Sequence, residues 1–221
     1  MKRERAFVES RRNRIVEIME EKPEVRVDEL SQLLGVSLIT IRRDLQYLEE
    51  QKLLVRNYGG AVSTMAPKNM KDEVQLYRKL IARYAADFVA ENDTIFINTS
   101  SNALQILEYV ECNNVTVITN NGKAIGREYC PGVNVVLTGG ELRHPKDAMV
   151  GDFTLRNLQH VYAKKAFVGC SGISAELGMT TEIFNEVSIN EMMIAHANQT
   201  VYVLADHTKI GSNSSFTSCP I

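Results

Sequence analysis

Apolar residues recur at helical spacing over the first fifty positions and predict three successive helices. The first covers residues 4–21 and ends before Pro23, because proline cannot continue a helix. Its apolar stripe consists of Phe7, Ile15, Ile18 and Met19. A second helical pattern starts near Val27 and ends at Gly35, a residue type suited to the left-handed position after a helix.

The third helical pattern starts after Ser37, a residue type that caps helices through its hydroxyl. Its core positions, spaced i, i+4 and i+7, are Ile41, Leu45 and Leu48. Residues 53–57 then suit a strand, a Gly-Gly pair permits a tight turn, and residues 61–62 can return. Three helices and a β-hairpin predict an α+β winged helix-turn-helix domain over residues 1–62.

The pattern changes after residue 62. Residues 63–70 are polar, contain Pro67 and lack periodicity, so we expect a linker there. A helical pattern covers residues 71–90, and short β-branched or aromatic runs then alternate with helical ones. The predicted strands are 94–98, 115–119, 133–138, 165–169 and 200–205, and the predicted helices include 103–110, 152–160 and 183–197. This alternation predicts an α/β domain with a mostly parallel sheet over residues 71–221.

Composition adds one local feature, a cluster of cations near the start. The net charge of −2 argues against a general polyanion binder, but residues 1–60 hold twelve Lys/Arg, six of them within the first fourteen positions. No apolar stretch follows them as in a signal peptide, and no run is long enough to span a membrane. The four separated cysteines are expected to be thiols in a reducing cytoplasm, with disulfide or metal roles as alternatives. We expect no cofactor and no metal site.

The second and third helices, with the turn between them, have the layout of a helix-turn-helix, whose second helix enters the DNA major groove. The candidate DNA contacts on that helix and on the hairpin are Ser37, Thr40, Arg42, Arg43, Gln46, Arg56 and Tyr58. Arginine can contact guanine or a phosphate, and short hydroxyls near a helix start suit phosphates. The alternative is that the two adjacent arginines are surface residues paired with Asp44 or Glu49, and that the winged helix binds protein.

Polar or glycine residues follow five of the predicted strands. In chain order, the candidate ligand contacts are Asn98, Ser100, Ser101, Asn102, Thr119, Asn120, Gly139, Gly140, Ser171, Gly172 and Lys209. Ligands in open parallel sheets bind outside the carboxyl ends of the strands, and free N–H groups at a helix start suit an anion. Together these residues predict a small-molecule site, although ordinary turn chemistry is the alternative for each one alone.

The motifs "VS-x-x-TIRRDL-x-x-LE" and "R-x-x-GGA" resemble the N-terminal domain of the DeoR family of bacterial transcription repressors. Over residues 71–217, segments such as "LTGGEL", "KAFVGCSGIS" and "VLADHTKIG" resemble the effector domain of that family. The resemblance implies a fold similar to ribose-5-phosphate isomerases and CoA transferases. It also implies that a sugar phosphate or related phosphorylated metabolite binds this domain and weakens the grip on DNA.

Several positions depart from the family pattern. The family loop Asp-x-Gly-Thr/Ser-Thr is Asn-Thr-Ser-Ser-Asn at 98–102, Ser171 replaces an aspartate, Asn190 stands where a lysine is usual, and Tyr58 replaces a histidine of the wing. Losing the ammonium should weaken a desolvated phosphate contact by about 1.5–3 kcal/mol. Either the pocket accepts a different ligand or it has lost ligand control. The resemblance also implies further residues after "SSF", so either the sequence is shortened or the closing strand is absent. An absent strand would expose a sheet edge and promote pairing between chains.

The sequence thus predicts a DNA-binding transcription regulator, expected to repress sugar or related metabolite genes. We expect it to bind a double-stranded operator as a homodimer or higher homo-oligomer, because a two-fold protein reads two half-sites. A small phosphorylated metabolite would release or modulate it. One alternative is a regulator whose degenerate sensor domain serves assembly only. The other is a sugar-phosphate isomerase-like enzyme, which Ser171 and Asn190 disfavour at the candidate base and lysine positions, so we assign no catalytic residue.

Overall fold

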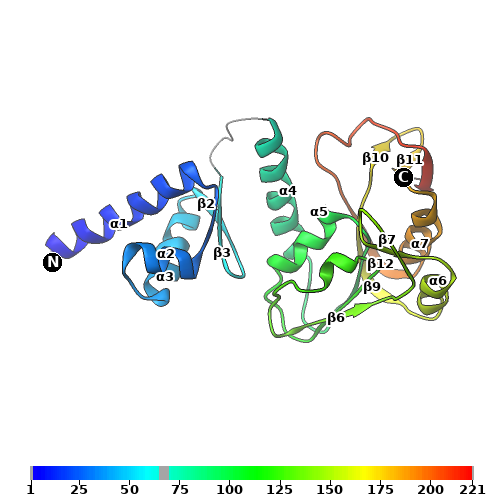
Figure 1. Ribbon diagram of the computed structural model, residues 1–221, viewed down its shortest axis with the longest axis horizontal. Helices are drawn as coiled ribbons and strands as arrows, with labels where there is room; N and C mark the ends of the chain where they lie inside the picture. The colour runs from blue at the N-terminus through cyan, green and yellow to red at the C-terminus, as the bar shows by residue number, and fades with distance from the viewer. Residues whose placement is uncertain (1, 65–69, 221) are drawn as a thin grey trace. The chain divides into compact units, whose positions relative to one another are not determined.

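The computed structural model describes residues 2–64 and 70–220, and the chain divides into two compact units between Leu76 and Tyr77. Figure 1 shows the helices and strands of both units. Residues 65–69 of the predicted linker lie outside the described residues.

Within residues 2–64, the first unit contains three helices and a small antiparallel sheet. Its elements are α1 (Lys2–Glu21), β1 (Glu24–Arg26), α2 (Val27–Leu34), α3 (Leu38–Glu50), β2 (Leu54–Asn57) and β3 (Gly60–Ser63). The strand order is β1-β3-β2. The predicted helices and hairpin are confirmed. The pattern does not predict β1, because three residues are too few to show a period of two.

The helices share one apolar core with this sheet. Its buried members are Ile15, Met19, Val25, Leu30, Ile41, Leu45, Leu48, Leu54 and Ala61. A Cβ on Gly60 would lie 1.9 Å from the carbonyl oxygen of Val25, so the close approach of β1 to β3 requires glycine. The predicted stripe of the first helix is wrong at Phe7, whose exposed fraction is 72%. Phe7 lies about two turns before Ile15, where α1 no longer faces the core.

The described part of the second unit is an α/β domain. The division falls within α4 (Met70–Ala86), whose residues from Tyr77 onward belong to this unit. The other elements are β4 (Thr94–Ile97), α5 (Ser101–Leu104), β5 (Val115–Thr119), β6 (Val133–Leu137), β7 (Glu141–Arg143), β8 (Ala148–Val150), α6 (Asp152–Leu158), β9 (Ala163–Gly169), β10 (Gly172–Ser174), β11 (Gly178–Thr181), α7 (Phe184–Ala195), β12 (Ala197–Leu204) and β13 (Phe216–Cys219). Two short 3₁₀ helices span Gln105–Glu108 and Gly122–Ala124.

A parallel sheet with the order β12-β9-β4-β5-β6 forms the centre of this unit, as predicted. The chain starts at the middle strand β4, moves outward to β5 and β6, and then returns to the other side of β4 as β9 and β12. The direction of winding therefore reverses between β4 and β9. In open parallel sheets, such a switch point leaves a crevice at the carboxyl ends of the strands, where ligands bind.

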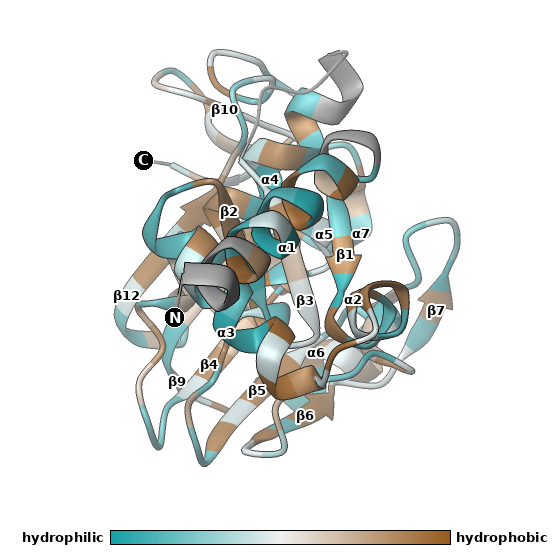
Figure 2. Cartoon of the chain, turned by 90° about the vertical axis from the view of Figure 1, so that its left-hand side faces the viewer, coloured by the Kyte–Doolittle hydropathy of each residue, from teal (hydrophilic) through white to brown (hydrophobic). Residues whose placement is uncertain are grey.

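Helices cover both faces of the sheet. Leu158 of α6 and Met193 of α7 pack on one face, against buried side chains that include Val168 of β9. Successive strand residues point to opposite faces, so Phe167 lies on the other face, where its ring stacks on that of Tyr202 with centroids 4.8 Å apart. Figure 2 shows hydrophobic stretches along β4 and β5, the strands between these layers. Among the described residues, no helix is long and apolar enough to cross a membrane.

Some local predictions for this unit are wrong. The helix predicted over 103–110 is a four-residue α-helix, capped by the Ser100 hydroxyl, followed by a 3₁₀ turn. The helix predicted over 71–90 ends at Ala86. The pattern also does not predict the hairpin β7–β8 or the antiparallel sheet β10-β11-β13. These strands are three or four residues long and lie outside the central sheet, so they carry little periodic signal.

Candidate functional site

Local sequence accounts for the turn between α2 and α3. Gly35 adopts the left-handed conformation with φ of 63°, and its N–H donates to the carbonyl oxygen of Ser31. The Ser37 hydroxyl accepts from the backbone N–H of Thr40 at 3.2 Å, and the two hydroxyl oxygens lie 2.9 Å apart. The exposed start of α3 is therefore capped and presents two hydroxyl groups beside free backbone N–H groups.

The two adjacent arginines of α3 are exposed, as the helix-turn-helix interpretation requires. Behind them Ile41 and Leu45 are buried, with exposed fractions of 0% and 1%. Within residues 2–64 and 70–220, neither Arg42 nor Arg43 forms an ion pair or a side-chain hydrogen bond. Their guanidinium groups are therefore available to a polyanion outside the domain.

Other arginines occupy the carboxylates that were the alternative partners for this pair. Asp44, only 2% exposed, accepts from Arg11 Nε at 2.6 Å and from Arg12 Nε at 2.9 Å. Arg12 also lies 3.7 Å from the centroid of the Tyr47 ring. These contacts fasten α1 to α3. They also neutralise part of the cation cluster seen near the start of the sequence, so the cationic surface is narrower than that cluster indicated.

The hairpin is fastened to α3 in the same way. The carboxylate of Glu49 accepts from the backbone N–H of Arg56 at 2.9 Å and from its Nε at 2.8 Å. The ion pair reduces the charge that Arg56 can offer DNA, so its predicted role there stays a prediction. Tyr58, near the tip of the hairpin, is 43% exposed, and the amide of exposed Gln46 lies 3.4 Å from Glu50. Both side chains remain accessible for the predicted contacts.

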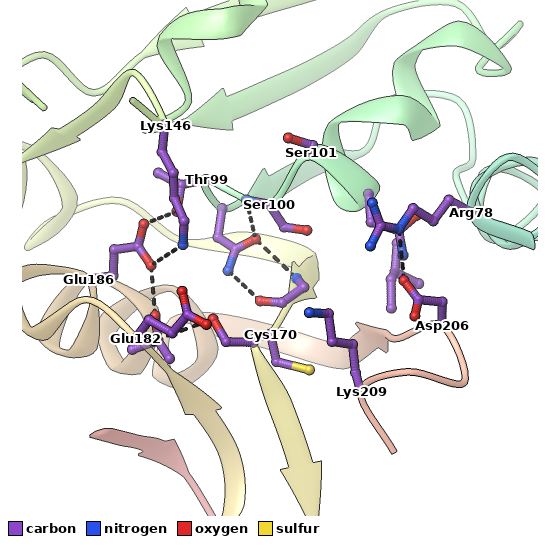
Figure 3. Close-up of a pocket in the computed structure, with 16 residues that line it drawn as sticks. Arg78, Thr99, Ser100, Ser101, Lys146, Cys170, Glu182, Glu186, Asp206 and Lys209 are labelled. Atoms are coloured by element: carbon purple, nitrogen blue, oxygen red, sulfur yellow. Dashed lines mark hydrogen bonds and ion pairs between the residues drawn. The ribbon is translucent and has the colours of Figure 1, made fainter. Parts of the chain in front are cut away.

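A cavity of about 230 Å³ lies at the switch point of the sheet (Figure 3). It is lined from the carboxyl ends of β4, β9 and β12, as the predicted ligand site requires. The predicted ligand contacts that line it are Asn98, Ser100, Ser101, Asn102, Ser171 and Lys209. The structure thus brings together three of the five strand ends named from the sequence.

The residues after β5 and β6, and Gly172, do not line this cavity. The remaining predicted contacts are Thr119, Asn120, Gly139, Gly140 and Gly172. Asn120 is buried and donates to the carbonyl oxygen of Met149, and a Cβ on Gly140 would lie 2.1 Å from Thr154 Oγ1. Gly172 belongs to β10, where its carbonyl oxygen accepts from Thr180. The predicted contacts after β5 and β6 lie away from the cavity because those strands lie beyond β4, on the far side from the switch point.

Ten lining residues were absent from the predicted set. They are Arg78, Thr99, Lys146, Gly169, Cys170, Thr181, Glu182, Glu186, Leu204 and Asp206. Arg78 comes from α4, and Lys146 from the turn of the hairpin β7–β8, neither of which follows a strand of the central sheet. The sequence offers one signal for this group, a pair of acidic residues at i and i+4 around the start of the helix predicted over 183–197.

Two departures from the family pattern meet beside the cavity, which Asn98 lines and Asn190 does not. Asn98 donates to Asn190 Oδ1 at 3.0 Å and to the carbonyl oxygen of Gly169 at 2.9 Å. Its own Oδ1 accepts from the N–H groups of Ser100 and Gly169. Where the resemblance implies an aspartate and a lysine, two buried amides therefore bond to each other. Because the aspartate and the lysine are replaced together, at positions 98 and 190, no single carboxylate or ammonium is left buried there without its partner.

Buried carboxylates hold two cations of the cavity, Lys146 and Arg78. Glu186 accepts from the hydroxyls of Thr99 and Thr181 at 2.8 Å, and Lys146 Nζ lies 3.4 Å from it. Asp206 accepts from Arg78 Nε at 2.7 Å. Burial raises the pKa of Asp206, but hydrogen bonds from a neighbouring hydroxyl and from Arg78 outweigh burial and hold that pKa below its usual value.

Cys170 is the sulfur in the cavity wall. Burial raises the pKa of its thiol, and nearby Lys209 lowers that pKa by less. The side chain is therefore a neutral thiol at physiological pH and acts as an apolar part of the wall.

Comparison with known proteins supports both parts of the molecule. The DeoR-like helix-turn-helix domain model matches residues 11–66, and the DeoR C terminal sensor domain model matches residues 74–221. The uncharacterised HTH-type transcriptional regulator YulB of Bacillus subtilis is 32% identical over 213 residues, covering 93% of this chain and 82% of that protein. The HTH-type transcriptional regulator GolR of Listeria innocua is 31% identical over 222 residues, covering 96% and 87%.

The lactose phosphotransferase system repressor of Staphylococcus epidermidis is 29% identical over 221 residues, covering 96% of this chain and 87% of that protein. Among solved structures, a D-ribose-5-phosphate isomerase with bound phospho-erythronic acid has 14% identity and a TM-score of 0.45, covering 62% of this chain and 54% of the isomerase. That likeness carries no argument about function. The two domain matches, with the exposed recognition helix and the capped turn before it, show that the chain belongs to the DeoR family of helix-turn-helix transcription regulators.

Proposed function

We propose that the protein represses genes for carbohydrate use and binds its operator DNA through α3. The observation that carries this proposal is the pair Arg42 and Arg43, exposed and without an ion pair in the described part of the chain. Their helix neighbours Asp44 and Glu49 already bind other arginines. The lactose phosphotransferase system repressor is similar over nearly the whole chain, and its name supports repression rather than activation.

A small phosphorylated metabolite is the proposed effector. The cavity at the switch point has the size of a small molecule and offers hydroxyls at the start of α5 together with the ammonium of Lys209. Its binding would alter the preferred arrangement of the protein and thereby weaken its affinity for DNA. We infer that the protein acts in the cytoplasm. We also infer that it forms a homodimer or larger homo-oligomer, because two-fold symmetric DNA-binding proteins bind two half-sites.

The test of DNA recognition begins with a random-sequence duplex library, from which the parent protein selects its preferred operator. Fluorescence anisotropy then gives affinities across a range of salt concentrations. Changing Arg42 or Arg43 to Ala should each cost about 1–3 kcal/mol of binding free energy if the side chain contacts a base. An arginine that contacts a phosphate should lower the slope of log affinity against log salt by about 1.

The matched control is Arg156→Ala, which removes an exposed arginine from α6 of the sensor domain and changes net charge by the same amount. It should bind the operator as the parent does. Equal affinities for the parent, both α3 variants and the control would refute the role assigned to α3. So would a selection that enriches no sequence.

A further inference from the structure

Charge is distributed unevenly in the cavity of the sensor domain. At one end lie Arg78, Asp206 and Lys209, which Figure 3 shows on the opposite side from Lys146 and Glu186. Arg78 is bound to Asp206, which is 2% exposed, so that pair is neutral. Within the described chain, no side chain forms an ion pair with Lys209. This end therefore carries one excess positive charge.

The other end has the opposite excess. Two carboxylates, those of Glu186 and Glu182, line this end with one cation, Lys146, whose Nζ lies 3.4 Å from Glu186. Glu186 is further satisfied by two threonine hydroxyls. The carboxylate of exposed Glu182 has no ion pair or side-chain hydrogen bond within residues 2–64 and 70–220. One negative charge at this end is left for a ligand.

We propose that the effector is a zwitterion, a phosphorylated metabolite that also carries a primary amine, such as an amino sugar phosphate. This inference rests on the proposed function and names the ligand class of the same cavity. The anionic group would lie at Lys209 and the Ser100–Ser101 hydroxyls, where the excess charge is positive. The ammonium would donate to Glu182, and beyond it Glu186 keeps its existing partners.

The alternative occupant, a phosphorylated polyol without an amine, fits the charges less well. Its hydroxyl would give the carboxylate a hydrogen bond but no counter-charge, whereas an ammonium would supply both the hydrogen bond and the opposite charge. In a partly closed cavity the unmatched carboxylate would also lose water without gaining a counter-charge. We therefore expect the amine to be preferred about tenfold over the matched hydroxyl compound.

The experiment compares glucosamine 6-phosphate with glucose 6-phosphate, and phosphoethanolamine with ethylene glycol monophosphate, by calorimetry on the full chain near neutral pH. The parent should bind the amine of at least one pair about tenfold more tightly than its hydroxyl partner. In Glu182→Gln this preference should fall to near one. Glu176→Gln, which changes an exposed carboxylate of the β10–β11 loop that does not line the cavity, should keep the full preference.

Thermal unfolding shows that each variant is folded before affinities are compared. Hydroxyl compounds that bind as tightly as their amine partners would overturn the zwitterion assignment and leave a phosphorylated effector in place. A preference that survives in Glu182→Gln would overturn the role of that residue. If no compound of either kind binds or weakens operator binding, both this inference and the proposed effector are wrong.

Discussion

Replacing Asp44 with Ala should destabilise the DNA-binding domain strongly, because the Asp44 side chain is buried and binds two arginines. Its carboxylate is 2% exposed and accepts two charge-assisted hydrogen bonds, from Arg11 and Arg12. Removing one partner of a buried pair costs about 3–5 kcal/mol. The arginine side chains are 13% and 24% exposed, so they can regain some water, and we expect a loss near the lower limit, about 3 kcal/mol.

That loss is large for a domain of this size. A stability of about 0.05–0.15 kcal/mol per residue corresponds to roughly 3–9 kcal/mol for some sixty residues. Hydrogen exchange followed by mass spectrometry on the full chain resolves peptides of α1 and α3 from those of the sensor domain. Protection of the α1 and α3 amides should fall about a hundredfold, while sensor-domain peptides keep theirs.

The matched control is Glu50→Ala, an exposed carboxylate near the end of the same helix, which should change stability by less than about 0.5 kcal/mol. A double-mutant cycle between Asp44→Ala and Arg11→Ala should show a coupling of about 0.5–3 kcal/mol. The reasoning is refuted if Asp44→Ala costs no more than Glu50→Ala. It is equally refuted if the two changes of the cycle are additive.

Two further outcomes follow from the structure. Gly60→Ala places a Cβ against the backbone of Val25 and should cost the DNA-binding domain about 1–3 kcal/mol by hydrogen exchange, whereas Gly59→Ala meets nothing within 4 Å and should be tolerated. Folding lowers the pKa of Asp206 from its ordinary value of 3.8, so its ionised carboxylate stabilises the folded sensor domain at pH values above 3.8. This contribution is lost as the pH falls through the lower pKa of the folded state. Chemical denaturation of the parent should therefore show a loss of stability in this acidic range, and Asp206→Asn should show a shallower one.

Local sequence was enough to predict the elements that depend on near neighbours along the chain. The cap at Ser37, the left-handed Gly35 and the buried spacing from Ile41 to Leu48 are all set within a few residues, and each is present in the structure. The strand over 115–119 was predicted with its true bounds for the same reason. Hydrophobic periodicity reports interactions at i, i+2 or i+4, which is the range over which helices and strands are specified.

Tertiary structure decided which charges meet, and therefore which remain available. Asp44 bonds to arginines 32 and 33 positions away, so the nearer Arg42 and Arg43 stay unpaired. Arg78 meets a carboxylate 128 positions distant, and so becomes part of the ligand cavity. Strand order, which places β9 rather than β6 beside β4, likewise selects the loops that line that cavity. These pairings depend on how distant segments are brought together, and no periodicity within one segment carries that information.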